Sequence, residues 1–477
     1  MNRFHKNITI ILIFLGLILR GSVSAQEAAK MTLDEAIKYA MTHSIALKNA
    51  RLNITDADLR IKENKASGLP QVNAELNLQR FIQQPAVPAS ALGFGQPSAD
   101  QIASGQYTEN RFLALEKALN ITKPNLPTPS SAEDIKIAFQ LKNNFTGGIT
   151  VSQLLFSGSY IVALRAAKNY QSLVNVQLTK AEETLRNQVV DAYLPILSID
   201  ETVKTLDKNI QNLEKFKAEV TATYKAGFVE QLDVDRLEFS VNNLKAQRDN
   251  LIRQRAIPLN YLKTAISYPL DQPLELTDDI NSLLKTMTES DVSTAINFQK
   301  RSEIRELDAN LKLLEINVDL QKASGLPTVA AFGSYQYSVQ GNTFNGLFGV
   351  PSALIGVTAK YNIWDSNERK TKIQRAALAL EQVRNAKGDL ERGITLQVLN
   401  ARVGISTAQK NLESQEKNLA LAQRIYDVTQ KKYKQGVGSS LEVITAERDI
   451  FAAQQTVRQA QYDILKAQMD LMKALGR

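Results

Sequence analysis

The sequence predicts a mainly α-helical chain with a small β part, built from two structural repeats. Stretches with helical periodicity dominate the 477 residues, and four short stretches alternate apolar and polar residues. Three motif pairs recur in the same order in both halves of the chain. They are KASGLP at 65–70 and 322–327, GITVSQLLFSGS and GVTAKYNIWDSN at 148–159 and 356–367, and YKAGFVEQLDV and YKQGVGSSLEV at 224–234 and 433–443. Ordered recurrence of this kind indicates a duplicated unit of about 200 residues.

The N-terminus has the pattern of a secretory signal. Arg3 and Lys6 precede an apolar run at 8–19, and small residues follow up to Ala25, where we expect cleavage. The run is too short to cross a bilayer as a helix, which takes about 20 residues. We therefore divide the chain into a signal peptide at 1–25, a first repeat at 26–267, a linker or equatorial segment at 268–290 and a second repeat at 291–477.

A helix is expected at the start of each repeat, and both of these helices end in a Gly-Leu-Pro motif. Gly68 and Gly325 suit a left-handed C-cap, and Pro70 and Pro327 push the preceding residue out of the helical region. The two expected helices comprise residues 33–65 and 292–322.

Alternation with a period of two predicts strands after these helices. In the first repeat Val72, Ala74, Leu76 and Leu78 are separated by polar residues, and a similar pattern runs through 355–363 in the second. Segments of about ten residues with one apolar face match lipid-exposed transmembrane strands. A half-buried strand of a soluble sandwich has the same pattern, but four such segments in an exported chain favour the membrane interpretation.

The ends of the strands and the segment between the first two carry further signals. Phe156 and Trp364 lie at corresponding strand ends, where aromatic residues of a membrane interface are found. Gly158 marks the point where a strand passes into a helix. The extra residues of the first repeat, 81–143, are rich in Pro, Gly and Ser, and we expect a long extracellular loop there.

Two very long helices are expected after the second strand of each repeat, at 159–226 and 366–435, each about 100 Å long at 1.5 Å per residue. Turns containing Gly227 and Gly436 then reverse the chain into return helices about half as long, at 229–266 and 440–474. We expect the first helix of each repeat to stack on the end of its return helix, and Pro258 to kink or end the first return helix. The expected coiled-coil seams are Val203, Leu206, Ile210, Leu213, Val220 and Tyr224, interrupted by Lys217, and Val443, Ala446, Ile450, Ala453, Val457, Ala460, Ile464, Ala467 and Leu471.

Four strands cannot form a closed membrane sheet by themselves. Unpaired edge amides find no water in lipid, and closure takes about eight strands or more. The sequence therefore predicts that several chains share one barrel.

These features resemble the TolC-like outer-membrane efflux proteins. The resemblance rests on the two-repeat plan, the GLP motifs ending at Pro70 and Pro327, the LFSG and IWDS junctions, and the YxxG turns followed by DV or EV. It implies a homotrimer with a 12-stranded outer-membrane β-barrel continued by a periplasmic α-helical coiled-coil barrel. It also implies a passive, gated exit duct of a tripartite efflux pump or type I secretion system, with a periplasmic adaptor (membrane fusion) protein, an inner-membrane pump and outer-membrane lipid as partners.

The family's closed periplasmic tip is held by tyrosine, arginine and aspartate contacts. The resemblance places its tyrosines at Tyr224 and Tyr433 and its acids at Asp233 and Glu442. The chain departs from the family pattern at Gly438 and Thr445, where an arginine and a second aspartate stand in well-studied members.

Physical arguments leave two roles open for each of these residues. Three copies of a carboxylate around one axis would favour cations, but both acids could instead stabilise the first turn of a return helix. The tyrosines could equally pack within the helical seam.

Other functional classes find little support in the sequence. There is no cysteine, and only His5 and His43 are present, so we expect neither a metal site, a cofactor nor catalytic residues. The formal net charge of +8 falls to +5 without the expected signal peptide, which removes three of 57 basic residues and none of 49 acidic ones, and so small an excess on an exported chain is weak support for nucleic-acid binding. The competing hypothesis is an envelope-spanning structural or adhesin-type outer-membrane protein whose long loop binds an external partner.

Overall fold

The computed structural model describes residues 29–88, 136–138, 140–287 and 294–476. The expected signal peptide and most of the expected loop at 81–143 lie outside these residues. The chain divides into two compact units, a helical one (the described parts of Met1–Lys62, Val162–Lys322 and Asn367–Arg477) and one that contains the sheet (Glu63–Ile161 and Ala323–Ser366).

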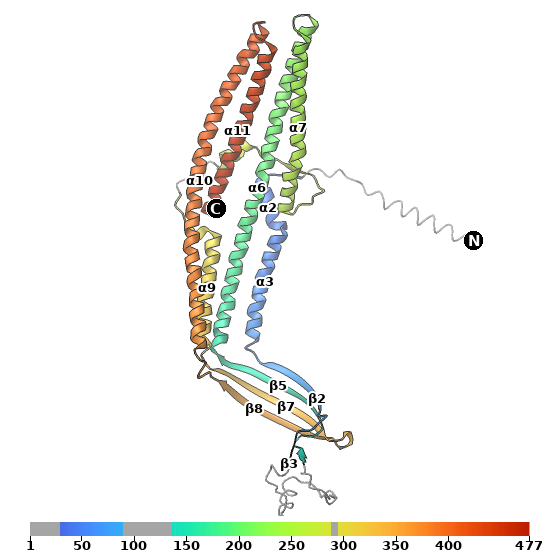
Figure 1. Ribbon diagram of the computed structural model, residues 1–477, viewed down its shortest axis with the longest axis vertical. Coiled ribbons are helices and arrows are strands. Elements are labelled where there is room, and N and C mark those ends of the chain that lie inside the picture. The colour runs from blue at the N-terminus through green and yellow to red at the C-terminus, as the bar shows by residue number, and fades with distance from the viewer. Residues whose placement is uncertain (1–28, 89–135, 139, 288–293, 477) are drawn as a thin grey trace, which may run out of the picture. The chain divides into compact units, whose positions relative to one another are not determined.

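Two very long helices dominate the helical unit, as expected. They are α6 (Gly158–Lys225) and α10 (Glu368–Lys434), with 68 and 67 residues. Each is followed by a return helix, α7 (Gln231–Ile266) and α11 (Ser440–Leu475), and α6–α7 and α10–α11 form two hairpins (Figure 1). No helix among the described residues is both long and apolar enough to cross a membrane. The remaining elements of this unit are β1 (Ala29–Met31), α2 (Leu33–His43), α3 (Ile45–Ala66), β6 (Leu274–Leu276), α8 (Ile280–Met287), η2 (Phe298–Lys300) and α9 (Ser302–Ala323).

The α10–α11 hairpin is joined along the expected alanine-containing seam. Seven of its nine α11 residues are buried, and Ala453 and Ala467 are half-buried. Small residues let the two backbones approach closely, because no long side chain separates them. The seam prediction for this helix is confirmed.

The α6–α7 hairpin combines an apolar seam with ion pairs. Phe216 is buried next to the expected interruption at Lys217, which reaches out to Glu238 at 2.9 Å. Phe216 therefore fills the gap in the apolar stripe. Tyr224, expected in the same stripe, is 39% exposed and does not belong to the core. Further ion pairs between the two helices are Lys245–Glu214, Arg248–Asp207 and Arg255–Asp200.

Two helix boundaries differ from expectation, and one proline does not end its helix. The helix expected at 33–65 is broken at Ser44, whose ψ of 126° ends α2 and whose carbonyl accepts the first hydrogen bond of α3. The helix expected at 292–322 begins only at Ser302, after a short 3-10 turn. Pro258 lies inside α7 without ending it.

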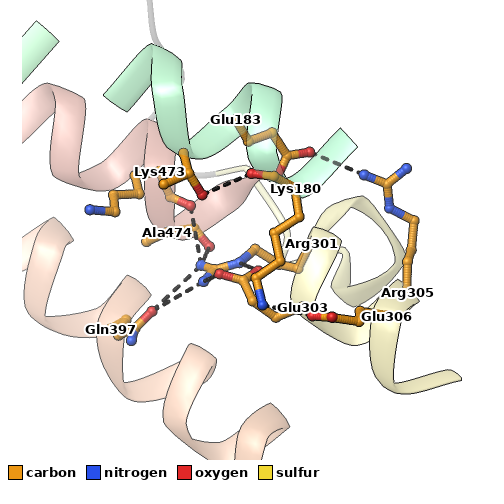
Figure 2. Close-up of polar contacts among 10 residues, drawn as sticks. Lys180, Glu183, Arg301, Glu303, Arg305, Glu306, Gln397, Lys473 and Ala474 are labelled. Carbon is orange, nitrogen blue, oxygen red and sulfur yellow. Dashed lines mark hydrogen bonds and ion pairs between the residues drawn. The ribbon is translucent and has the colours of Figure 1, made fainter. Parts of the chain in front are cut away.

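The end of α11 is clamped to the start of α9 by Arg301 (Figure 2). Its buried guanidinium donates to the carbonyls of Lys473 at 3.1 Å and Ala474 at 2.8 Å, and to Glu303 at 3.0 Å. Helix C-termini present unsatisfied carbonyls and a partial negative charge, so a buried arginine stabilises this end. The expected stacking of the second repeat's first helix on its return helix is confirmed.

The linker at 268–290 is tied to the N-terminal part of the helical unit. Strand β6 pairs in parallel with β1, and Asp278 accepts hydrogen bonds from the backbone N–H of Leu33 at 2.7 Å and from the hydroxyl of Tyr193 at 2.9 Å. Tyr193 is fully buried, and burial together with the Asp278 carboxylate raises its pKa. The linker therefore caps α2 and covers the middle of α6.

The second unit is an open, four-stranded antiparallel sheet in the order β2-β5-β7-β8 (Figure 1). A separate pair, β3 (Ala86–Pro88) and β4 (Lys136–Ala138), and a 3-10 turn, η3 (Phe344–Gly346), complete this unit. The strands of the sheet are β2 (Gln71–Arg80), β5 (Asn143–Ser157), β7 (Thr328–Gly341) and β8 (Phe348–Lys360).

One face of the sheet is apolar and exposed, as the alternation predicts. The register places Leu76, Gly147, Tyr337 and Pro351 in one row of this face. The opposite face is polar on β2 and β5 and mixed on β8. Large side chains exposed on the apolar face are Val72, Leu76, Leu78, Ile149, Val151, Tyr335, Tyr337, Ile355 and Val357.

A β-bulge determines where Phe156 lies. The pairing of β5 with β7 shifts between Leu154 and Phe156, so that Phe156 pairs with Val329. Without the extra residue Phe156 would point to the polar face, because side chains alternate along a strand. The bulge thus brings its ring to the apolar face. Trp364 is 80% exposed but lies beyond β8, which ends at Lys360 rather than continuing to 363 as expected.

The junction glycines are needed for space and not for backbone conformation. Gly68 and Gly325 were expected in the left-handed region, and neither has a positive φ. A side chain at Gly68 would collide with Tyr160, and one at Gly158 would meet Leu326 and a helix carbonyl. Both glycines therefore permit close packing where helices pass into strands.

Candidate functional site

Both helical hairpins turn by the same mechanism at their tips. Gly227 and Gly436 have φ values of 81° and 75°, as the turn prediction requires. The N–H of Gly436 donates to the carbonyl of Tyr433, and that of Val437 to Lys432, and the same bonds occur around Gly227. This pattern is the Schellman C-cap, in which a left-handed glycine satisfies the last carbonyls of a helix.

The two hairpins pack against each other near these turns in an apolar core, here called the tip cluster. Its members come from α6, α7 and α11, so each hairpin depends on the other for burial of its apolar face. The buried residues of the tip cluster are Leu213, Phe216, Val220, Val234, Leu237, Val241 and Val443.

Asp233 connects the return helices of the two hairpins. The hydroxyl of Ser440, the first residue of α11, donates to its carboxylate, and Arg236 lies 3.8 Å from the same oxygen. The Asp233 side chain is 23% exposed. A carboxylate in the first turn of one helix and at the start of another is stabilised by both helix dipoles. Within one chain, Asp233 therefore acts as a bridge between hairpins.

Glu442 is exposed and makes no comparable contact. It occupies the third position of α11, and its backbone N–H donates to the Ser439 side chain at 3.2 Å. The structure therefore does not bring Glu442 and Asp233 together, although both lie at the tips. Thr445, the departure from the family pattern, is also exposed and donates to the carbonyl of Leu441.

The two tyrosines of the prediction have different surroundings. The ring of Tyr433 packs edge-on against Phe216 at 5.1 Å between centroids, whereas Tyr224 is exposed. The Tyr433 hydroxyl is buried and has no hydrogen-bond partner among the described residues. Burial, Asp233 and Glu219 raise the pKa of Tyr433. Gly438 lies against the backbone of Tyr433, so a side chain at 438 would need this turn to shift.

Sequence reasoning missed a buried acid close to the tip. Glu447 on α11 is only 4% exposed; burial raises its pKa to about 7, and a hydrogen bond with Tyr426 of α10 opposes this rise. Its position in the sequence could have indicated its burial, because Glu447 directly follows the seam residue Ala446 and lies three residues before the seam residue Ile450. A charged residue beside a small seam residue is buried because the helices approach closely there.

Arg301 is the second residue that sequence reasoning missed. Its Nη1 donates to the two α11 carbonyls, its Nε and Nη2 donate to Glu303, and Gln397 of α10 lies 3.5 Å away (Figure 2). Nearby, Lys180 pairs with Glu306 at 2.6 Å and Arg305 with Glu183 at 3.1 Å, which joins α6 to α9. Among the described residues no group of acids and histidines is arranged to hold a metal ion.

Long helical hairpins and an open sheet with one exposed apolar face are the features of an outer-membrane channel protein. Residues 298–477 match the sequence model of the family described as outer membrane efflux protein. No curated protein sequence matches the chain.

Several solved structures share this fold over 93% of the chain. VceC of Vibrio cholerae is 14% identical, with a TM-score of 0.64 over 96% of its own chain. CmeC of Campylobacter jejuni is 15% identical, with a TM-score of 0.64 over 85% of its chain. The open state of MtrE of Neisseria gonorrhoeae is 18% identical, with a TM-score of 0.62 over 88% of its chain.

The resemblance to the TolC-like outer-membrane efflux proteins is therefore confirmed. Residues 298–477 match the outer membrane efflux protein family, and the described chain has the fold of the solved structures named above. The protein is located in the outer membrane, with its helical part in the periplasm.

Proposed function

We propose that three copies of the chain join their sheets edge to edge into a 12-stranded barrel, continued in the periplasm by a barrel of 12 helices. The observation that carries this proposal is the open sheet, in which β2 and β8 are each paired on one side only. The trimer forms a passive exit duct from the periplasm to the exterior.

The energetic argument follows from the apolar face. Exposed side chains such as Leu76 and Ile355 favour lipid, but lipid offers no partner for the outer N–H and C=O groups of β2 and β8. These strands have 10 and 13 residues, so bare edges would cost on the order of tens of kcal/mol at several kcal/mol per unpaired group. Pairing β8 of one copy with β2 of the next removes this cost.

The partners follow from the family. A passive duct needs an energy source, so we propose that an inner-membrane pump and a periplasmic adaptor complete a tripartite efflux pump or type I secretion system. The periplasmic end closes at the helical tips, where Asp233, Glu442, Tyr224 and Tyr433 contribute to the gate. The Asp233 bridge supports this proposal, because opening must separate or tilt the hairpins that it connects.

The division of the chain follows the same plan. We propose a first repeat at 26–267 and a second at 291–477, with the segment at 268–290 forming an equatorial part around the helical barrel. The hydrogen bonds of Asp278 to α2 and α6 support such a role for this segment.

Disulfide cross-linking tests the shared barrel, because the chain has no cysteine of its own. Ala74→Cys on β2 is combined with one cysteine moved along the same face of β8, at Pro351, Ala353, Ile355 or Val357. A disulfide forms only where Cα atoms lie within about 7 Å, so one register should give covalent dimers and trimers and nothing larger. The matched control pairs Ala74→Cys with Ala331→Cys on the central strand β7, which should not cross-link.

Conductance separates the duct from its competitor. The purified protein in planar bilayers should give a measurable single-channel conductance, whereas an adhesin or spacer predicts none. Absence of either cross-linked trimers or conductance would refute the proposal.

A further inference from the structure

The four strands of the sheet contain very few charges. They carry three side chains that are charged at neutral pH, Glu75, Arg80 and Lys360, and only Glu75 lies near the middle of a strand. Arg80 ends β2, where its guanidinium lies over the Phe344 ring at 5.4 Å, and Lys360 ends β8. The central part of the sheet therefore has one fixed charge.

Glu75 lies on the polar face of the sheet. The register places it in a row with Gly148, Gln336 and Ser352. The β7 and β8 members of this row, Gln336 and Ser352, have neutral polar side chains. The apolar neighbours of Glu75 along β2, Ala74 and Leu76, point to the opposite face because side chains alternate. In the proposed barrel the apolar face meets lipid, so Glu75 faces the lumen.

The surroundings of Glu75 are open. A hollow of about 290 Å³ beside it is lined by Asn77, Thr146, Gly148 and Gln336, among others. Gly148 lies close to the backbone of β7, since a Cβ there would lie 3.0 Å from the Tyr335 carbonyl. Amides and hydroxyls hydrate a passing ion without adding charge, so the carboxylate dominates the electrostatics of this level.

No counter-charge within the described sheet neutralises Glu75. Its side chain makes no ion pair or hydrogen bond with any residue that the structure describes. Arg80 follows Glu75 by about 17 Å along β2 and lies over the Phe344 ring, and Lys360 follows Ser352, the β8 residue in the Glu75 row, by about 25 Å of extended strand. Both separations exceed the Debye length of about 10 Å at 0.1 M salt, so both cations are screened from Glu75 at that salt concentration.

We infer that Glu75 is the residue that sets the charge preference of the barrel lumen. This inference rests on the proposed trimer, in which three Glu75 carboxylates lie at one level around the axis. Such a ring concentrates cations and repels anions. The predicted preference is for small cations and cationic solutes over anions, and its source is the barrel lumen.

The test measures reversal potentials of the full-length protein in planar bilayers with a KCl gradient. At about 0.01 M salt, where the Debye length is about 30 Å, Glu75→Gln should lower the K⁺/Cl⁻ permeability ratio by about twofold or more. Glu75→Lys should reverse the preference, and Gln336→Glu in the same row should strengthen it. At about 1 M salt, where the Debye length is about 3 Å, the variants should converge.

Controls keep the outcomes distinct. Glu275→Gln removes an exposed carboxylate of β6 in the helical unit and should leave the ratio unchanged. A single-channel conductance that is unchanged at about 1 M salt and a trimer band on unboiled gels show that each variant has assembled. If Glu75→Gln leaves the low-salt ratio unchanged in a conducting channel, the inference is overturned while the duct stands. The same holds if only Asp233→Asn lowers the ratio. If the wild type does not conduct at all, the proposed function itself fails.

Discussion

Replacing Glu447 by glutamine should stabilise the helical tip at neutral and alkaline pH. The carboxyl group is 4% exposed, and burial raises its pKa from 4.5 to about 7, against a hydrogen bond with Tyr426. In the unfolded chain the pKa returns to its ordinary value. The folded protein therefore holds this proton more tightly than the unfolded chain does.

The sign and size of the effect follow by linkage. Well below pH 4.5 Glu447 is protonated in both the folded and the unfolded state, so it does not lower the free energy of unfolding. As pH rises from 4.5 to 7 the unfolded chain gains the ionised form first, so the folded state loses stability, and above pH 7 the loss is complete. At 1.36 kcal/mol per pKa unit the difference corresponds to about 3 kcal/mol. Glu447→Gln keeps the shape of the side chain and removes this cost.

Hydrogen exchange of the α10–α11 amides near the tip, together with thermal unfolding, measures the effect at pH 4.5 and pH 8. The variant should be protected more strongly than the wild type at pH 8 and equally at pH 4.5. Glu442→Gln is the matched control, because Glu442 is exposed on the same helix and should show no pH-dependent gain. An equal difference between Glu447→Gln and wild type at both pH values would refute the reasoning.

Three further predictions concern single residues of the helical unit. Arg301→Lys should lower the free energy of unfolding, measured with urea, by about 3 kcal/mol, because a buried lysine cannot bond both helix carbonyls and Glu303. A loss under about 0.5 kcal/mol, the scale of an ordinary surface substitution, would contradict the clamp. Tyr433→Phe should be neutral or stabilising by about 1 kcal/mol in thermal unfolding, because the buried hydroxyl lacks a partner; if it instead destabilises the protein and increases leak conductance, the hydroxyl bonds to a neighbouring copy. Gly227→Ala and Gly436→Ala should each cost about 1 kcal/mol through the left-handed backbone, while the corresponding asparagine variants cost less; equal costs for alanine and asparagine would exclude this explanation.

Most of the fold could be predicted because apolar residues recur with a regular period over long stretches of the sequence. Helices α6, α10 and α11 lie within two residues of the expected bounds, since a stripe sustained over many turns leaves little ambiguity. The misses occur where a short-range effect overrides the pattern. Ser44 breaks a helix by capping the next one, and Phe216 replaces Lys217 in the stripe, which a strict heptad count does not allow.

The candidate site could be predicted only in part, for a different reason. Gly227 and Gly436 were predictable because their backbone conformation is a local property of the turn. The partners of Asp233 and Glu447 depend on which hairpin lies beside which, and that is decided by tertiary packing. Gly68 shows the same limit: its position was expected, but its physical reason is the Tyr160 ring, which is distant in sequence.

The bare edges of the sheet also bear on how the protein is made. If a newly exported copy formed its sheet before it met other copies, two unpaired edge strands and an apolar face would be exposed to water. Such surfaces favour aggregation. The helical hairpins carry mainly local contacts and can fold early. For the proposed trimer we therefore expect the helical units of three copies to associate first. Strand pairing between copies and insertion into the bilayer would then occur together, at a rate that depends steeply on the concentration of the chain.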